Sequence, residues 1–321
     1  MGSKRRRNMK IALIIVAVVV GIAAVFVALT YPRYHREMQA AKVRLLSGSE
    51  ILKTDHGTIE YAVQGEGTPV LTLHGAGGGY DQGLWLGKMA LGDGYKFISV
   101  SRYGYLRTPI PTNASIKTQA ALYKDLLDHL NIQKVIVGGG SAGGPSATQF
   151  ANDYPERTSA LILISAVTEA SVRGDKPAFY VGIIRLIQQS DYAYWLVAKF
   201  MQPAILNLMG IPAEVYGKFT PVQKQMAQEM LDTMHPMTAR YPGTVNDGEM
   251  IQREAVSTDN VLAPTLILHA KDDALVSYHH AEHAHEAIKG SRLISFDSGG
   301  HGLLSQMDAV REDVKEFRER L

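Results

Sequence analysis

Val135-Ile-Val-Gly-Gly-Gly-Ser141-Ala-Gly-Gly-Pro-Ser146 is the stretch of this chain that decides the fold. Three β-forming residues run into glycines, a serine and further small residues, and a helix-compatible segment (residues 147–152) follows. This order predicts a buried strand, a tight turn and a helix. Gly139, Ser141 and Gly143 also fit the spacing G-x-S-x-G, in which a serine occupies a strained strand-to-helix turn.

The glycines of this turn have a physical role. The serine backbone is forced toward φ > 0, and a Cβ two residues before or after it would clash with the crossing backbone. The following helix N-terminus directs backbone N–H groups at any oxyanion formed there. A glycine-rich turn that only packs tightly or binds phosphate is the alternative, so the partners of Ser141 decide between the two interpretations.

Apolar runs and amphipathic segments alternate through most of the chain. Continuous apolar strands separated by helical patterns predict an α/β fold with a mostly parallel sheet covered on both faces. One predicted helix spans Ser115–Leu130, with Ser115 as N-cap, and the last spans Leu304–Leu321. The predicted strands are Ile59–Val63, Val70–Leu73, Phe97–Val100, Val135–Val137, Leu161–Ile164, Thr265–Leu268 and Leu293–Phe296.

The alternation breaks between residues 167 and 261. This segment is rich in aromatic residues and methionines but has no strand pattern. We interpret it as a helical cap inserted between two strands, in which flexible methionines could line an adaptable apolar pocket. Ordinary packing between helices would use the same residue types.

The N-terminus has the composition of a membrane anchor. Residues 1–10 hold five basic residues and no acid, and 13 of the 20 uncharged residues 11–30 are Ile, Leu, Val or Phe. A helix of 20 residues spans roughly 30 Å, the thickness of the bilayer hydrocarbon. We therefore expect a basic N-terminus, signal anchor and linker over residues 1–44 and the catalytic domain over 45–321. A cleaved signal peptide is the alternative.

The charge distribution bears on orientation and on partners. The basic cluster before the span predicts a single-pass protein with an extracytoplasmic catalytic domain, although four basic residues between Arg33 and Arg44 oppose this orientation. The first ten residues contribute +5 to a formal net charge of +2, so the rest carries −3. Nucleic acid is therefore not an expected partner, whereas the lipid bilayer is, through residues 11–30. The absence of cysteine excludes disulfides and thiolate metal sites.

Polar residues follow two later predicted strands. Lys271-Asp272-Asp273 comes after the strand that ends at Leu268, and Gly300-His301-Gly302 comes after the last strand. The carboxyl ends of parallel strands are where α/β sheets assemble ligand sites. A histidine there could take and return the Ser141 proton, while a carboxylate fixes its tautomer.

With the order Ser…Asp…His, the chain resembles the α/β-hydrolase fold superfamily over residues 50–321. The shared features are the Gly139–Gly143 turn, the Lys271–Asp273 turn, Gly300–Gly302, the segment His74-Gly-Ala-Gly after an early strand, and Arg102-Tyr-Gly-Tyr-Leu106. Gly140 and Ala270 depart from residues common in the family, and neither change removes a functional group.

The resemblance implies a role for each matching residue. Ser141 would be the nucleophile, His301 the base, and the N–H groups of Ala76 and Ala142 the oxyanion hole. Alignment with the family's G-x-x-D pattern favours Asp273 over Asp272 as the acid.

Two other groups of residues offer alternative chemistry. Glu169 is a weaker alternative acid, because some members of the family take the acid after that earlier strand. The histidines at 279, 280, 283 and 285 are interpreted as a solvated helix rather than a metal site, because no third ligand is identifiable. No cofactor or metal is expected.

These residues predict a serine hydrolase that cleaves an uncharged, partly apolar ester or related acyl substrate through an acyl-enzyme. Carbon–carbon bond hydrolases, amidases and cofactor-free haloperoxidases of the same fold share the Ser-His-Asp set. These three residues therefore do not distinguish the reaction types from one another. A non-catalytic, membrane-tethered binding protein is the alternative from another class.

Overall fold

The computed structural model describes residues 2–170 and 178–321. The chain divides into two compact units, Met1–Leu46 and Ser47–Leu321. The division falls two residues beyond the boundary at 44/45 that the sequence indicates.

The first unit is formed by a single helix, α1 (Gly2–Ser47), with Pro32 in its interior. Residues 11–30 are helical as expected, but the helix continues well past them. Its polar second half includes an i,i+4 ion pair between Arg33 and Glu37, which is a stabilising spacing on a helix. Among the described residues, Arg6–Ser47 is the one helix long and apolar enough to cross a membrane, judged by length and composition.

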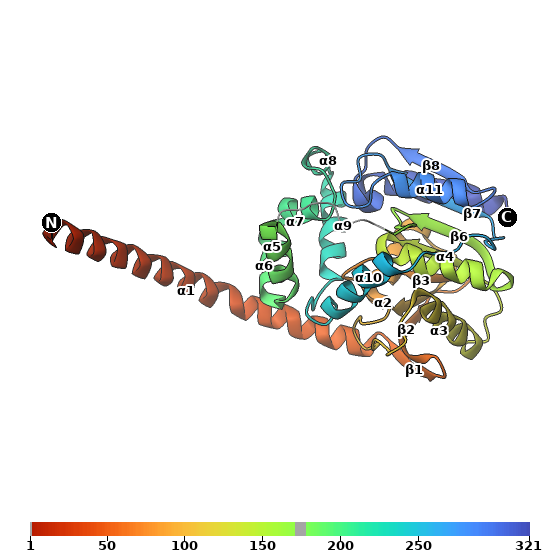
Figure 1. Ribbon diagram of the computed structural model, residues 1–321, viewed down its shortest axis with the longest axis horizontal. Helices are drawn as coiled ribbons and strands as arrows, with labels where there is room; N and C mark the ends of the chain where they lie inside the picture. Colours follow the sequence, from red (N-terminus) through yellow and green to blue (C-terminus); the bar gives the residue numbers. More distant parts are fainter. Residues whose placement is uncertain (1, 171–177) are drawn as a thin grey trace. The chain divides into compact units, whose positions relative to one another are not determined.

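The second unit is built on an eight-stranded sheet of order β1-β2-β4-β3-β5-β6-β7-β8. Figure 1 shows β1 and β2 toward one edge of the sheet and β7 and β8 toward the other. The β1–β2 and β2–β4 pairs are antiparallel, and all other neighbouring strands are parallel. The strands are β1 (Glu50–Thr54), β2 (Gly57–Gln64), β3 (Thr68–Leu73), β4 (Tyr95–Ser101), β5 (Val135–Gly140), β6 (Thr158–Ile164), β7 (Thr265–Ala270) and β8 (Arg292–Phe296).

The mostly parallel α/β architecture is confirmed, and all seven predicted strands are present. Strand β1 was not predicted. Its sequence Glu-Ile-Leu-Lys-Thr mixes polar and apolar residues, and every residue of the strand is exposed or half-buried. An edge strand that pairs on one side only has no need of a continuous apolar run, so hydrophobic patterning gives it little signal.

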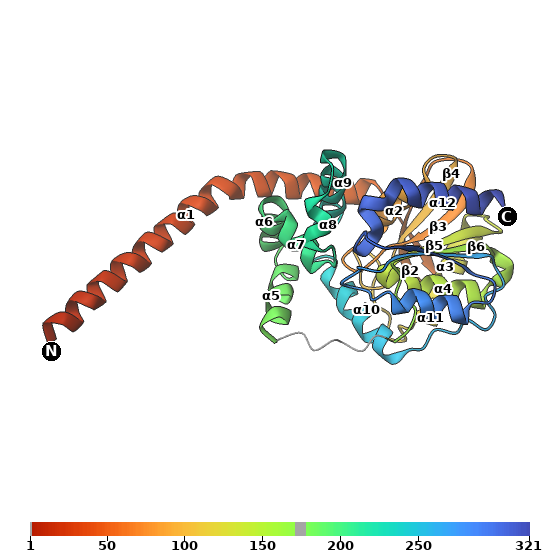
Figure 2. The same cartoon turned by 90° about the horizontal axis from the view of Figure 1, so that it is seen from above.

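Helices cover both faces of the sheet (Figure 2). One hydrophobic cluster packs α3 (Ile116–His129), α4 (Gly144–Asp153) and α11 (His279–Ala287) against one face. The other cluster includes α2 (Tyr80–Leu91) and α12 (Met307–Glu319). The central strands are therefore buried on both sides, which explains their uninterrupted apolar sequences.

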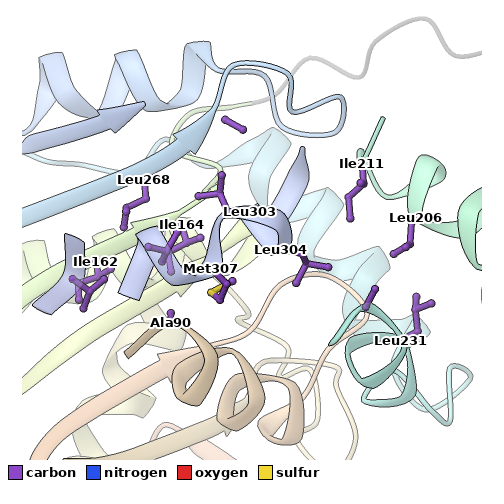
Figure 3. Close-up of a cluster of buried hydrophobic side chains, with 14 of the residues drawn as sticks. Ala90, Ile162, Ile164, Leu206, Ile211, Leu231, Leu268, Leu303, Leu304 and Met307 are labelled. Atoms are coloured by element: carbon purple, nitrogen blue, oxygen red, sulfur yellow. The ribbon is translucent and has the colours of Figure 1, made fainter. Parts of the chain in front are cut away.

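The segment between β6 and β7 contains helices joined by loops, and no strand, in its described part. Its helices are α5 (Ala178–Gln188), α6 (Asp191–Phe200), α7 (Gln202–Leu208), α8 (Ala213–Gly217), α9 (Pro221–Asp232) and α10 (Tyr241–Arg253). Apolar side chains join it to the sheet: Leu206, Ile211 and Leu231 from the insertion belong to the same buried cluster as Ile164 and Leu268 (Figure 3).

The C-terminal helix begins later than its periodicity predicts. A short 3₁₀ segment, η3 (His301–Gln306), precedes α12 and is kinked at Gly302 and Leu303, both with positive φ. Leu303 and Leu304 are fully buried, so the apolar spacing that predicted helix from residue 304 reflects packing of this kinked segment.

Candidate active site

Ser141 lies at the carboxyl end of central strand β5, in the turn that leads through the 3₁₀ segment η1 (Ser141–Gly143) into α4. Its φ is 49°, a left-handed backbone conformation that is uncommon for a residue with a Cβ. A Cβ at Gly139 would lie 2.6 Å from the Ala147 Cβ, and one at Gly143 would overlap the carbonyl oxygen of Leu73. The turn therefore has the strain and the glycine requirement expected from the sequence.

His301 connects this serine to an acid. Its Nε2 lies 3.0 Å from the Ser141 Oγ, and its Nδ1 lies 2.8 Å from Oδ2 of Asp273. Because an ionised carboxylate only accepts, Nδ1 carries the proton and Nε2 is free to accept from the Ser141 hydroxyl. The three side chains come from the loops after β5, β7 and β8, so the parallel sheet brings together residues 160 positions apart.

Asp273 is buried and fully engaged. Its Oδ1 accepts the backbone N–H groups of Leu275 and Val276, each at 2.9 Å, and His269 Nε2 lies 3.3 Å from its Oδ2. Burial alone would raise the pKa of this carboxyl, but hydrogen bonds from His269 and His301 outweigh it and hold the pKa of Asp273 well below its usual range. It is therefore ionised at neutral pH and able to stabilise a protonated His301.

The adjacent Asp272 has a different set of partners. It accepts the backbone N–H groups of Gly299 at 2.9 Å and Gly300 at 2.8 Å, and the hydroxyl of Ser298 at 2.7 Å. It therefore holds the loop that presents His301 without contacting the imidazole. The structure thus separates the two candidate acids that follow one another in sequence.

The two expected oxyanion donors lie beside Ser141. Ala76 follows Gly75, and a Cβ at Gly75 would come within 3.1 Å of the Ser141 Cβ, so the loop runs close to the serine. Ala142 directly follows Ser141 and is buried. Within the part of the chain that the structure describes, the Ala76 N–H has no hydrogen-bond acceptor, which leaves it available to a ligand.

Glu169 and the histidine-rich helix are not part of this group. Glu169 lies 3.3 Å from Nε2 of His279. His283 contacts Thr168, and His285 contacts Ser291. No group of three or more His, Cys, Asp or Glu side chains within residues 2–170 and 178–321 is arranged to hold a metal ion.

A cavity of about 270 Å³ opens onto Ser141 and His301. The sheet side contributes Ala76, Gly140 and Ser165, among others. The insertion contributes most of the apolar lining: Ile184, Ile187, Tyr194, Ile205, Leu208, Met209, Ile211, Met230, Met234 and Met237. No Lys, Arg, Asp or Glu is present among the lining residues that the structure describes.

Two contributors to the site were missed from the sequence. His269 precedes the acid by four residues and contacts its carboxylate, and its own Nε2 also lies 3.0 Å from the Val276 oxygen. Ser165, with φ of 46°, accepts the backbone N–H of Gly302 beside His301. Neither fits a spacing rule; only their positions just before and after strand ends could have marked them.

Comparison with known proteins gives consistent results. A sequence model described as α/β hydrolase fold matches residues 68–179, and one described as TAP-like protein matches residues 246–319. An uncharacterized hydrolase of Bacillus subtilis, YcgS, is 34% identical over 263 residues, which cover 78% of this chain and 91% of the relative.

Solved structures share the fold. An α/β hydrolase fold protein from Nakamurella multipartita is 25% identical, with a TM-score of 0.74, and the match covers 84% of this chain and 98% of the other. An esterase from Exiguobacterium antarcticum is 22% identical, with a TM-score of 0.64, over 84% of this chain and 99% of the esterase.

Proposed function

The chain belongs to the α/β-hydrolase fold family, and from this premise we propose that it is a serine hydrolase acting on an uncharged, partly apolar ester or related acyl substrate. The observation that carries the proposal is the hydrogen-bonded series Ser141–His301–Asp273, with contacts of 3.0 and 2.8 Å, on the wall of an apolar cavity. A general base within about 3.2 Å of a hydroxyl, itself oriented by a carboxylate, is the arrangement that activates serine.

In the proposed reaction Ser141 Oγ attacks the substrate carbonyl while His301 Nε2 takes its proton. The N–H groups of Ala76 and Ala142 stabilise the tetrahedral oxyanion, and the protonated imidazole returns the proton to the leaving alcohol. Water, activated by the same imidazole, then hydrolyses the acyl-enzyme. The ionised Asp273 stabilises the imidazolium in both steps.

The cavity supports the substrate class. No Lys, Arg, Asp or Glu lies among its described lining residues, so a charged acyl group would lose its hydration without gaining a partner. Its volume of about 270 Å³ lies just below the range of roughly 300–1,000 Å³ that is usual for small-molecule pockets. This volume favours short or medium acyl groups over long fatty chains.

The test is covalent labelling with a fluorophosphonate, followed by hydrolysis of p-nitrophenyl esters of graded acyl length. We expect labelling of the native protein, no labelling of Ser141→Ala, and a preference for short or medium esters. An unlabelled native protein would support the non-catalytic binding protein. Labelling without ester turnover would direct attention to the amide and carbon–carbon bond substrates of the same fold.

We also propose that α1 anchors the enzyme as a single span with the catalytic unit outside the cytoplasm. The support is an uncharged run of 20 residues preceded by five basic ones. Carbonate extraction of membranes tests anchoring, since full-length protein should remain in the pellet. Protease treatment of intact spheroplasts tests orientation, since residues beyond 45 should be digested before permeabilisation.

A further inference from the structure

The loop that carries the proposed oxyanion donor Ala76 is bracketed by two ion pairs, one buried and one partly buried. We define the oxyanion loop as residues 75–79; His74 precedes it, and Asp81 follows it in the first turn of α2. Each end is linked to the insertion between β6 and β7 by an arginine–aspartate pair. Arg102 of the sheet unit pairs with Asp247 of the insertion, and Arg240 of the insertion pairs with Asp81.

His74 fixes the first peptide of the loop. Its side chain is buried, and its Nε2 accepts the backbone N–H of Arg102 at 3.1 Å. The ring proton is therefore on Nδ1, which donates to the Gly75 carbonyl at 2.7 Å. Because the peptide unit is planar, holding the Gly75 C=O also sets the direction of the Ala76 N–H. Burial and the charge of Arg102 lower the pKa of His74 well below its usual value, so the ring remains neutral.

Arg102 carries this constraint into the insertion. Its Nε donates to the His74 carbonyl at 2.8 Å, and its two terminal nitrogens donate to Asp247 at 2.5 and 2.6 Å. Tyr105 completes the contact by donating its hydroxyl to Asp247 at 2.6 Å. Both charged side chains are almost fully buried, at 1% and 4% exposed.

Arg240 holds the other end of the loop. Its guanidinium donates to the two Asp81 oxygens at 3.0 and 2.9 Å and to the His235 carbonyl at 2.9 Å. It also lies against the loop itself, since a Cβ at Gly79 would come within 2.7 Å of its Nη1. Arg240 is the N-cap of α10, and Asp247 follows it by seven residues, about two helical turns, so both face the same side.

We propose that Arg102, Asp247, Arg240 and Asp81 are positioning residues, through which the position of α10 determines the geometry of the oxyanion loop. Buried ion pairs contribute little stability compared with apolar packing, but they hold groups in one geometry. Here α10 contributes the aspartate of one pair and the arginine at its N-cap contributes to the other. The helix is therefore linked to the chain on both sides of the oxyanion loop. The catalytic consequence of this inference rests on the proposed function; the structural coupling does not.

The test compares Asp247→Asn and Arg240→Lys with Arg157→Lys. Arg157 is the matched control, because it also bridges distant segments, pairing with Asp128 and the carbonyl of Ile132 away from the cavity. Arg240→Lys keeps the positive charge and loses only the two-point hydrogen bonding of the guanidinium to Asp81. It therefore remains informative if Asp247→Asn fails to fold. Circular dichroism and thermal melting establish which variants are folded.

The first measurement is hydrogen exchange at the Gly78 N–H, which donates to the Gly75 carbonyl within the loop. We expect exchange about tenfold faster or more in Asp247→Asn and Arg240→Lys and unchanged exchange in Arg157→Lys. Unchanged exchange in a folded Asp247→Asn or Arg240→Lys variant overturns the coupling. This readout needs no turnover, so it remains decisive if the native protein proves inactive and the proposed function fails.

The second measurement separates transition-state from ground-state binding. We expect kcat to fall roughly 10- to 100-fold, less than the 10²–10³-fold lost on deleting an oxyanion donor, with KM within about twofold. Affinity for an aryl trifluoromethyl ketone, which forms a tetrahedral adduct on serine, should weaken by the same factor. A rise in KM with constant kcat would instead indicate that the pairs shape only the substrate pocket and overturn the positioning role.

Discussion

Asparagine at position 273 should remove nearly all turnover, whereas asparagine at the adjacent position 272 should retain most of it. In the structure, Asp273 Oδ1 accepts the backbone N–H groups of Leu275 and Val276, and Oδ2 accepts Nδ1–H of His301. The amide oxygen of an asparagine must face the two backbone donors, because an NH₂ group there would leave both unpaired in a buried site.

The amide NH₂ of Asp273→Asn then faces His301 and donates to Nδ1. The ring proton moves to Nε2, which can no longer accept the proton of Ser141. Loss of the correct tautomer in Ser-His-Asp sites lowers kcat by roughly 10⁴-fold. At 1.36 kcal/mol per factor of ten, this is about 5 kcal/mol of transition-state stabilisation.

The same replacement at Asp272 preserves every contact. The amide oxygen can still accept from the backbone of Gly299 and Gly300, both of which reach Oδ1. The NH₂ group then faces the Ser298 hydroxyl, which can accept as well as donate. Only the charge assistance is lost, about 1 kcal/mol, so we expect kcat to fall by about tenfold or less.

The assay is steady-state hydrolysis of a short p-nitrophenyl ester by both variants, with thermal melting to establish that each is folded. The rate of fluorophosphonate labelling supplies a second measure of Ser141 activation. Equal losses in the two folded variants would refute the tautomer argument. A larger loss at position 272 would move the acid by one residue.

Four further outcomes are expected. Gly138→Ala should stabilise the protein by about 0.5–1 kcal/mol, because its Cβ would meet only a carbonyl oxygen at 3.8 Å. Gly139→Ala should destabilise it by about 1–3 kcal/mol, because its Cβ would overlap with α4. Urea denaturation measures both changes in the free energy of unfolding. Burial lowers the pKa of His235 to about 4, below its value in the unfolded chain. The free energy of unfolding is therefore highest above pH 6.5 and falls as the pH drops toward 4, because the unfolded chain binds a proton that the buried ring does not. At pH 5 the loss is about 2 kcal/mol, and His235→Phe should remove this part of the pH dependence of unfolding. Ile187→Trp should fill the cavity and shift the ester profile to shorter chains. Leu186→Trp, at a more exposed position of α5 that does not line the cavity, should leave the profile unchanged. Deletion of residues 1–30 should release active catalytic unit into the soluble fraction, as ultracentrifugation and esterase assay of the supernatant would show.

The sequence was most informative where local chemistry restricts the backbone. The glycines around Ser141 indicated a strained turn because few other residues tolerate it, and the apolar runs indicated strands buried on both faces. The roles of Asp272 and Asp273 were harder to predict, because adjacent carboxylates are equivalent in sequence. In the structure one accepts from the backbone of Gly299 and Gly300 and the other contacts His301. Edge strand β1 left little hydrophobic signal, since every one of its residues is exposed or half-buried.

The sequence by itself determined the α/β class and the apolar N-terminal helix, and it marked Ser141, His301 and the Asp272-Asp273 pair as candidate site residues, because each depends on a short pattern of neighbouring residues. The tertiary structure alone decided their distances, the contact of His269 with the acid, and the attachment of the oxyanion loop to α10. Arg102 and Asp247 lie 145 positions apart, and nothing in either local sequence marks the other as its partner. The two residues meet only because the folded insertion places α10 beside the loop after β4, where both side chains are buried and either charge without the other would be costly.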